Sequence, residues 1–364
     1  MKKVLNGNAI VYCENAFNTP NGKTAHGLVR FTERYNVLAV LDSHYNGMDA
    51  GEVLDKKHAG IPIFRDLAVA LAYAEKKGTP AQYFVMGLAP DGGKLPDAAR
   101  KTVKEAIDAG LNVDSGLHDF ISDDEKLASL AKEKGVRIRD VRKTPPRSEL
   151  HFFSGEIEKV DVLTVALLGT DSAVGKRTTA WILVHALRHQ GIKAELVGTG
   201  QTAWMQGAKY SFVLDSLIND FVAGEIEHAV VSAWKDGAEV IVIEGQGSLM
   251  NPAYPGGFEI LAAGRPGIVV MQHAPARKEY DGFPGYLLHP LADQIKAVEF
   301  LSGKPVVAIT VNHEDLKTEQ VQDACDAITK DVGLPAFDVL LHGGNGLADL
   351  IKQYLAKKNQ KKEP

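Results

Sequence analysis

One stretch in the middle of the chain constrains the fold more than any other. The apolar run Val162–Leu168 is followed by Gly169, four further residues, Gly175 and Lys176, and then by a helical pattern. A strand, a glycine-bracketed loop and a helix in this order surround an anionic phosphate with backbone N–H groups and the positive end of the helix. The spacing therefore predicts a phosphate-binding loop within an α/β fold.

We assign the phosphate contacts to this loop and to the start of the following helix. The set comprises Gly169, Thr170, Asp171, Ser172, Ala173, Val174, Gly175, Lys176, Arg177 and Thr178. In the usual motif a Ser or Thr follows the lysine, and its hydroxyl binds Mg²⁺. Arg177 occupies that position here, and Thr178 lies about 100° further around the helix. The loop therefore favours a ligand whose terminal phosphate is not transferred, and Arg177 could grip an additional phosphate.

Apolar β-branched runs alternate with helical patterns on both sides of this loop. This alternation is typical of βαβ units and parallel sheets. Two adjacent prolines, Pro145 and Pro146, interrupt it, and they fit neither a helix interior nor a central strand. We therefore predict two α/β domains, residues 1–145 and 146–364. The strands expected in the second domain are Val162–Leu168, Ala194–Val197, Val240–Ile243, Ile268–Gln272, Val306–Val311 and Phe337–Leu341.

Glu244 follows the buried-strand run Val240–Ile243 and precedes the glycine-rich segment Gly245–Gly247. A carboxylate at the carboxyl end of a parallel strand points into the crevice where α/β proteins bind ligands. There it could take a proton from an amine or a water, bind a substrate ammonium or ligate a metal. A carboxylate that only organises its loop is the alternative. We predict that Glu244 is catalytic, and the scattered histidines predict no dedicated metal site.

His273 and Arg277 follow the next predicted strand, Ile268–Gln272. His273 is a second candidate catalytic base, because an unperturbed imidazole titrates near neutral pH. Arg277 could hold a substrate carboxylate through two parallel hydrogen bonds. The alternatives are a structural histidine and an ion pair from Arg277 to Glu279 or Asp281.

The N-terminal half offers two further candidates for substrate binding. Lys23 lies in Asn18–Gly27, which is either a surface turn or a loop that reaches the phosphate site. Asp42 follows the predicted strand Val37–Leu41 and could bind substrate or cap the next helix. No G-x-G-x-x-G follows a strand in this half, so nicotinamide dinucleotide binding has no support.

Composition excludes several other classes of protein. The 41 Lys and Arg against 46 Asp and Glu give a net charge of −5, which provides no basic field for nucleic acid. No apolar run approaches the roughly 20 residues of a membrane helix, and no signal-like stretch opens the chain. The two cysteines, Cys13 and Cys325, form no zinc or thioredoxin motif. We expect a cytoplasmic protein with reduced thiols and a small-molecule substrate, which could form a homo-oligomer.

Several of these motifs resemble known families. Gly169–Lys176 and Glu244–Gly247 together resemble the phosphate loop and second motif of dethiobiotin synthetase. The whole chain resembles a two-domain family long catalogued as a domain of unknown function, through Asn18–Ala25, Ser115–Asp119 and Pro145-Pro146. That resemblance implies a Rossmann-like N-terminal domain followed by a P-loop NTPase-like domain with a mostly parallel sheet. One activity in the family is D-glutamate N-acetyltransferase.

The resemblance therefore implies an enzyme that transfers an acetyl group from acetyl-CoA to the amine of a small acidic amino acid such as D-glutamate. CoA carries a pyrophosphate and a 3′-phosphate, and its use requires no phosphate transfer. It therefore suits a loop in which Arg177 replaces the magnesium-binding hydroxyl. Two alternatives stay open: a ligase or kinase that uses ATP and Mg²⁺, resembling dethiobiotin synthetase, and a non-catalytic protein that binds nucleotide or CoA.

Overall fold

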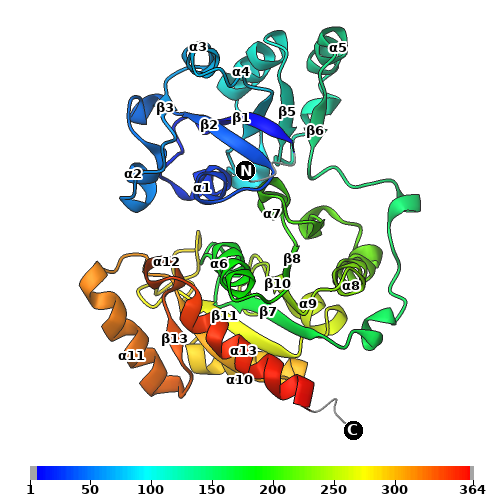
Figure 1. The fold of residues 1–364 in the computed structure, drawn as a ribbon, viewed down its shortest axis with the longest axis vertical. Coiled ribbons are helices and arrows are strands. Elements are labelled where there is room, and N and C mark those ends of the chain that lie inside the picture. The colour runs from blue at the N-terminus through cyan, green and yellow to red at the C-terminus, as the bar shows by residue number, and fades with distance from the viewer. Residues whose placement is uncertain (1–5, 361–364) are drawn as a thin grey trace. The chain divides into compact units, whose positions relative to one another are not determined.

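The computed structural model describes residues 6–360, which form two compact units, each built on one parallel sheet (Figure 1). The first unit contains the residues up to Thr144 together with Gln201–Ala208. The second contains Pro145–Gly200 and the residues from Lys209 onward. The two parallel sheets confirm the predicted α/β class, and the chain passes between the units three times.

The first unit has a six-stranded sheet in the order β3-β2-β1-β4-β5-β6. Its strands are β1 (Gly7–Tyr12), β2 (Tyr35–Leu41), β3 (Ile63–Phe64), β4 (Tyr83–Met86), β5 (Asn112–Ser115) and β6 (Ile138–Asp140). Its helices are α1 (Lys23–Arg30), α2 (Ala50–Asp55), α3 (Leu67–Lys76), α4 (Asp97–Asp108), α5 (Glu125–Lys134) and α7 (Gln201–Gln206). The order reverses direction between β1 and β4, the point at which open α/β sheets form a crevice.

Helix α7 packs in the first unit although the residues on both sides of it belong to the second. Met205 is fully buried in the core of the first unit. The side-chain amide of Gln206 donates to the carbonyl oxygens of Gly27 and Phe31, both at 2.9 Å. These contacts make α7 part of the structure of the first unit.

The second unit has a seven-stranded sheet in the order β13-β12-β11-β7-β10-β8-β9. Its strands are β7 (Leu163–Gly169), β8 (Ala194–Gly198), β9 (Tyr210–Ser211), β10 (Val240–Glu244), β11 (Ile268–His273), β12 (Val306–Val311) and β13 (Ala336–Phe337). Its helices are α6 (Lys176–His189), α8 (Asn219–Lys235), α9 (Phe258–Ala263), α10 (Leu291–Ser302), α11 (Val321–Val332), α12 (Val339–His342) and α13 (Asn345–Gln360).

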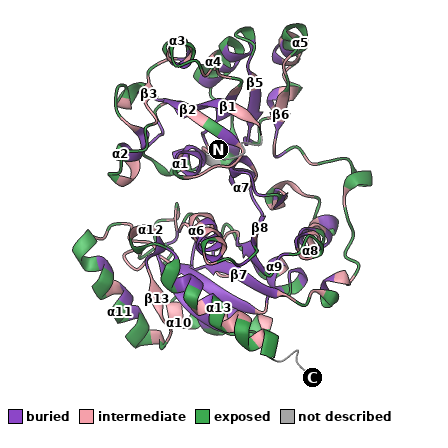
Figure 2. Cartoon of the chain, in the orientation of Figure 1, coloured by how far each residue is buried: buried purple, intermediate pink, exposed green. Residues whose placement is uncertain are grey.

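Every residue of β7, β10 and β12 is buried (Figure 2). Strands covered on both faces need apolar side chains on both, so they appear in the sequence as continuous apolar runs. Side chains of β7 alternate between the two faces: Leu168 belongs to the same core cluster as Val298 of α10. Because β11, β7 and β10 pair in parallel, their carboxyl ends meet at one edge of the sheet.

One predicted strand is wrong. Phe337–Leu341 was expected to be a strand, but only Ala336–Phe337 pairs with β12. Asp338 then ends the strand, because its carboxylate accepts hydrogen bonds from the N–H groups of Leu340 and Leu341 and caps helix α12.

Candidate functional site

The phosphate loop of the second unit connects the end of β7 to the start of α6. Its backbone enters the left-handed region twice, at Ala173 (φ 52°) and at Gly175 (φ 98°). Glycine adopts that conformation freely, whereas Ala173 does so at a cost of order 1 kcal/mol. A Cβ atom at Gly169 would lie 3.0 Å from Lys176 Cδ and Val174 Cγ2, closer than most Cβ contacts, so a side chain there would force its neighbours to shift. The loop is therefore tightly wound around its predicted anion site.

The last three predicted phosphate contacts, Lys176, Arg177 and Thr178, form the first turn of α6. The first N–H groups of a helix have no partners within the helix and carry its positive end. The structure thus places all ten predicted contact residues on the loop and at the helix start, as expected for an anion cradle.

Lys176 is buried, and carbonyl groups of the phosphate loop and of the segment after β10 hold its ammonium group. Nζ donates to the carbonyl oxygens of Asp171, at 2.6 Å, and of Gly247, at 2.7 Å. Burial lowers the pKa of Lys176 to about 8, while the nearby carboxylates of Asp171 and Glu244 oppose that shift. A phosphate bound beside this ammonium would raise its pKa again, because an opposite charge favours the protonated form.

Asp171 is fully buried and links the phosphate loop to two neighbouring loops. Oδ1 accepts hydrogen bonds from the Ser172 N–H and from the Asn251 side-chain amide, both at 2.7 Å. Oδ2 accepts from Arg277, at 2.7 Å, and from the Asp281 N–H, at 2.8 Å. Because these donors come from the loops that follow β10 and β11, one carboxylate sets the geometry of three loops.

Arg277 is held by acidic groups of the protein on both sides of its guanidinium. Nη1 contacts Asp171, and Nη2 pairs with Glu314 at 2.8 Å. Burial opposes the charge of Arg277, but the hydrogen bonds that it donates to Glu314 and Asp171 outweigh this effect and raise the pKa of Arg277. These partners differ from the two considered from the sequence, Glu279 and Asp281. Asp171 and Glu314 already accept hydrogen bonds from both terminal nitrogens of the guanidinium group. Contact with a substrate carboxylate stays a prediction.

Glu244 ends β10 with only 4% of its surface exposed. Its Oε2 accepts a hydrogen bond from the Thr199 N–H at 2.9 Å, and the Thr199 hydroxyl donates to the Glu244 carbonyl at 3.0 Å. Burial raises the pKa of Glu244, and the charges of Arg177 and Lys176 together with the Thr199 N–H oppose the increase. A buried carboxylate with a raised pKa beside two cations is a candidate for proton transfer.

His273 ends β11, and its Nδ1 lies 3.0 Å from the hydroxyl of Thr170 in the phosphate loop. Burial lowers the pKa of His273 to about 4, and the positive charge of Arg277 lowers it further in the same direction. The imidazole is therefore neutral at pH 7 and able to accept a proton, although a pKa this low makes it a weak base.

The two candidates from the N-terminal half lie in the first unit. Lys23 is exposed and begins helix α1, so the predicted turn ends at Gly22 and a helix follows it. Asp42 is fully buried, and its carboxylate accepts hydrogen bonds from the N–H groups of Phe17, at 3.0 Å, and His44, at 2.9 Å. Both carboxylate oxygens of Asp42 thus hold backbone groups, and substrate binding by either residue stays a prediction.

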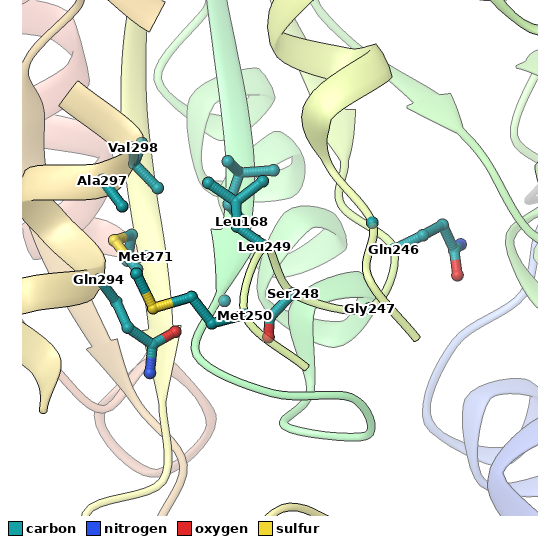
Figure 3. A pocket seen from close by; sticks show the side chains of 12 residues that line it. Leu168, Gln246, Gly247, Ser248, Leu249, Met250, Met271, Gln294, Ala297 and Val298 are labelled. Carbon is teal, nitrogen blue, oxygen red and sulfur yellow. The ribbon is translucent and has the colours of Figure 1, made fainter. Parts of the chain in front are cut away.

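A small pocket lies beside the phosphate loop, between β7, β11, α10 and the loop after β10 (Figure 3). Its volume is about 10 Å³, enough for a single water molecule. The Ser248 hydroxyl is buried there with no hydrogen-bond partner in residues 6–360, whereas the Gln246 side chain points away and donates to Thr199 Oγ1. The apolar walls are Leu168, Leu249, Met250, Met271, Ala297 and Val298.

Sequence reasoning missed this pocket. The segment Gly247–Leu249 is not a nucleophile elbow of the G-x-S-x-G type, because Met250 stands at the position of the final glycine. No signal in the sequence indicates that Gln294 of α10 faces the same segment, since that contact joins residues more than forty positions apart.

Across residues 6–360, no helix is both long and apolar enough to span a membrane. The same residues contain no group of three or more His, Cys, Asp or Glu side chains arranged to hold a metal ion. Cys13 and Cys325 are both buried as free thiols.

Two family models match this chain, one on each side of the proline pair. A Rossmann-like domain described as a domain of unknown function, DUF1611_N, matches residues 43–144. A P-loop domain described as a domain of unknown function, DUF1611_C, matches residues 151–348. The chain belongs to the DUF1611 family. This membership confirms the resemblance to a two-domain family and the predicted pairing of a Rossmann-like domain with a P-loop domain.

Two relatives of this DUF1611 protein are named D-glutamate N-acetyltransferase. A D-glutamate N-acetyltransferase of Tritonibacter scottomollicae is 31% identical over 283 residues, which cover 76% of this chain and 83% of that protein. A D-glutamate N-acetyltransferase of a Pseudoalteromonas species is 30% identical over 273 residues, covering 72% and 79%. The crystal structure of a DUF1611 family protein from Anabaena variabilis has a TM-score of 0.86 at 28% identity, covering 96% of this chain and 100% of that one.

Proposed function

We propose that this DUF1611 protein transfers an acetyl group from acetyl-CoA to the amine of D-glutamate. The observation that carries the proposal is the similarity, over 76% and 72% of the chain, to two proteins named D-glutamate N-acetyltransferase. The candidate site supports the proposal because it combines a phosphate loop with a buried carboxylate at the end of the adjacent strand.

The phosphate loop fits the donor in two respects. Gly169 carries no side chain, and the start of α6 directs the positive end of the helix toward the loop, so phosphate oxygens can approach closely. Arg177 stands where a magnesium-binding hydroxyl would be in an ATPase. A pyrophosphate or 3′-phosphate of CoA needs the anion cradle but needs no transfer of a phosphoryl group.

Glu244 supplies the proton acceptor in this proposal. The amine of an amino acid is an ammonium at neutral pH, and only its neutral form is a nucleophile. A carboxylate whose pKa is raised by burial takes that proton more readily than an exposed one. The amine nitrogen then attacks the thioester carbonyl carbon, and a C–N bond forms.

The tetrahedral intermediate carries its negative charge on the former carbonyl oxygen. Backbone N–H groups or a cation of the site would stabilise this oxyanion. Collapse of the intermediate breaks the C–S bond, and the CoA thiolate leaves and takes up a proton. Holding amine and thioester together supplies much of the acceleration in reactions of this kind.

Release of free thiol from acetyl-CoA, measured with a thiol reagent, tests the proposal. We expect release to require D-glutamate and to yield N-acetyl-D-glutamate by mass spectrometry. L-glutamate, D-aspartate and a reaction without acceptor are the controls. No acetylated product with any acidic amino acid would refute the proposal.

The same assay run in the presence of a chelator distinguishes acetyl transfer from the leading alternative, a ligase or kinase that uses ATP and Mg²⁺. Turnover is expected to survive EDTA, because no phosphoryl group is transferred. Complete loss in EDTA, restored by Mg²⁺ and accompanied by ATP consumption, would instead favour a ligase or kinase like dethiobiotin synthetase.

A further inference from the structure

Two loops that border the phosphate loop carry three aromatic side chains, which we call the aromatic cluster: Tyr254, Phe283 and Tyr286. The ring centroids of Tyr254 and Phe283 lie 6.3 Å apart at 66°, and those of Phe283 and Tyr286 lie 6.4 Å apart at 82°. Tyr254 and Tyr286 are 56% and 58% exposed. Rings that meet edge to face in this way leave flat faces open to a further planar group.

The carboxylate of Asp171 ties both loops to the phosphate loop. Asn251 donates to Asp171 Oδ1 at 2.7 Å, and its own Oδ1 accepts the N–H of Tyr254 at 2.8 Å. The Asp281 N–H donates to Asp171 Oδ2 at 2.8 Å, two residues before Phe283. The aromatic cluster is therefore fixed to the phosphate loop through a single buried group of that loop.

The segment that carries Phe283 and Tyr286 is itself a closed hairpin. The N–H of Tyr280 donates to the Tyr286 carbonyl at 2.9 Å, and that of Leu288 donates to the Lys278 carbonyl at 2.8 Å. Tyr280 anchors the hairpin, since its ring is buried and its hydroxyl lies 2.8 Å from His289 Nδ1. An aromatic surface held in place by such a hairpin loses little conformational entropy when a ligand binds.

We propose that the aromatic cluster stacks the adenine ring of the ligand whose phosphate the loop binds. Adenine is planar and apolar on its faces, and in an adenosine phosphate only a ribose separates it from a phosphate. Aromatic side chains bind bases of this kind through their faces. The inference rests on phosphate binding by the loop, which the proposed acetyltransferase shares with the ATP-dependent alternative, because CoA and ATP both contain adenine.

Calorimetry with two matched ligands tests the stacking. CoA contains the adenosine, whereas 4′-phosphopantetheine keeps the arm and one phosphate without it. Phe283→Ala and Tyr254→Ala are each expected to weaken CoA binding by about 5- to 150-fold and to leave 4′-phosphopantetheine binding unchanged. Phe300→Ala, which removes an 87% exposed ring of α10 outside the cluster, is the matched control and should change neither affinity.

A second readout does not depend on the size of the affinity change. Phe283→Trp keeps an aromatic face and adds a fluorescent reporter to the cluster. CoA and ADP are expected to quench the added fluorescence, and 4′-phosphopantetheine and inorganic pyrophosphate are not. The melting temperature of each variant is measured to establish that it is folded, because Phe283 is half-buried whereas Tyr254 and Phe300 are exposed.

The outcomes separate this inference from the proposed function. Binding of ATP but not CoA, weakened by Phe283→Ala relative to inorganic tripolyphosphate, would refute acetyl transfer and support the stacking. Acetyl transfer with equal losses for CoA and 4′-phosphopantetheine, or with no loss for either, would overturn the stacking alone. A parent protein that binds no adenine nucleotide at all would also overturn it.

Discussion

The carboxyl ends of the two sheets use acidic side chains in different ways. In the first unit, Asp42 follows β2 and Asp140 ends β6, and both oxygens of each carboxylate accept backbone N–H groups of nearby loops. In the second unit, Glu244 ends β10 beside the cations Lys176 and Arg177, and burial raises its pKa. A carboxylate at the carboxyl end of a strand is therefore not in itself evidence of a catalytic role.

Burial alone does not separate the two edges, because Asp42 and Asp140 are buried as well. What distinguishes Glu244 is a burial-raised pKa together with the positive charges of Arg177 and Lys176 beside it. Lys176, Glu244 and His273 all have pKa values shifted toward their neutral forms by burial. Three shifted groups around one loop are typical of a site that handles charge or protons. We therefore expect the chemistry of the proposed reaction in the second unit, and we expect Asp42 and Asp140 of the first unit to stabilise loops.

The largest expected effect comes from Glu244→Gln, which keeps the size of the side chain and removes its charge. As a general base, Glu244 is worth about 10²- to 10⁴-fold in turnover, with little change in CoA affinity. Steady-state kinetics of D-glutamate acetylation measures the loss. An effect confined to KM for the amine would make Glu244 an ionic partner only. A variant with parental rate and KM would leave it a loop-organising residue and make His273 the next base to test.

Lys176→Ala is expected to weaken binding of the phosphate ligand by about 1–3 kcal/mol, the scale of a charge-assisted hydrogen bond. Calorimetry on the folded variant measures the change. Lys101→Ala, on the exposed surface of α4 in the first unit, is the matched control and should leave CoA affinity intact. Unchanged affinity of Lys176→Ala for every CoA or nucleotide ligand of the parent protein would contradict the phosphate-loop assignment.

Asp42→Ala is expected to lower the free energy of unfolding by about 0.5–2 kcal/mol, because it removes the acceptor of two backbone N–H groups. Chemical denaturation measures this loss, and turnover per folded molecule should not change. A raised KM for D-glutamate at full stability would instead show that Asp42 binds substrate, and the contrast between the two sheet edges would fail.

At pH 7 the smallest effect is expected from His273→Asn, because this histidine is mostly neutral there in both the folded and the unfolded chain, and the change appears only in the pH dependence of stability at lower pH. The folded pKa of about 4 lies below the ordinary value of 6.5, so the unfolded chain binds more protons between these pH values. This histidine therefore makes the parent less stable as the pH falls from 6.5 to 4. Thermal unfolding across that range should show a shallower decline for the variant. Parallel curves would mean that His273 titrates normally in the folded protein.

The sequence predicts the buried strands of the second unit closely, because strands covered on both faces must be apolar throughout. The expected run Val240–Ile243 differs from β10 by one residue, and Val306–Val311 coincides with β12. The phosphate loop is predictable for a similar reason, since its glycines and lysine follow from local backbone geometry. The prediction of a strand at Phe337–Leu341 is wrong because it rests on the apolar residues of the segment. Asp338 within it instead caps helix α12 and ends the strand.

Contacts between distant residues could not be predicted in this way. The partners of Arg277 come from the phosphate loop after β7 and from the segment after β12, and their spacing along the chain carries no signal. The sequence around Gln201–Gln206 likewise gives no indication that this helix packs with residues such as Gly27. Both depend on which surfaces meet in the folded chain rather than on a local propensity.

The placement of α7 also determines how this protein can be divided. A fragment that ends at Thr144 would lack Met205 in its core and the amide of Gln206 on the Gly27 and Phe31 carbonyls. A fragment that begins at Pro145 would carry the same helix without the surface on which it packs. The two halves on either side of the proline pair are therefore not independent folding units. Gene fusion or fission at that junction would separate the first unit from Gln201–Ala208, the segment that completes it.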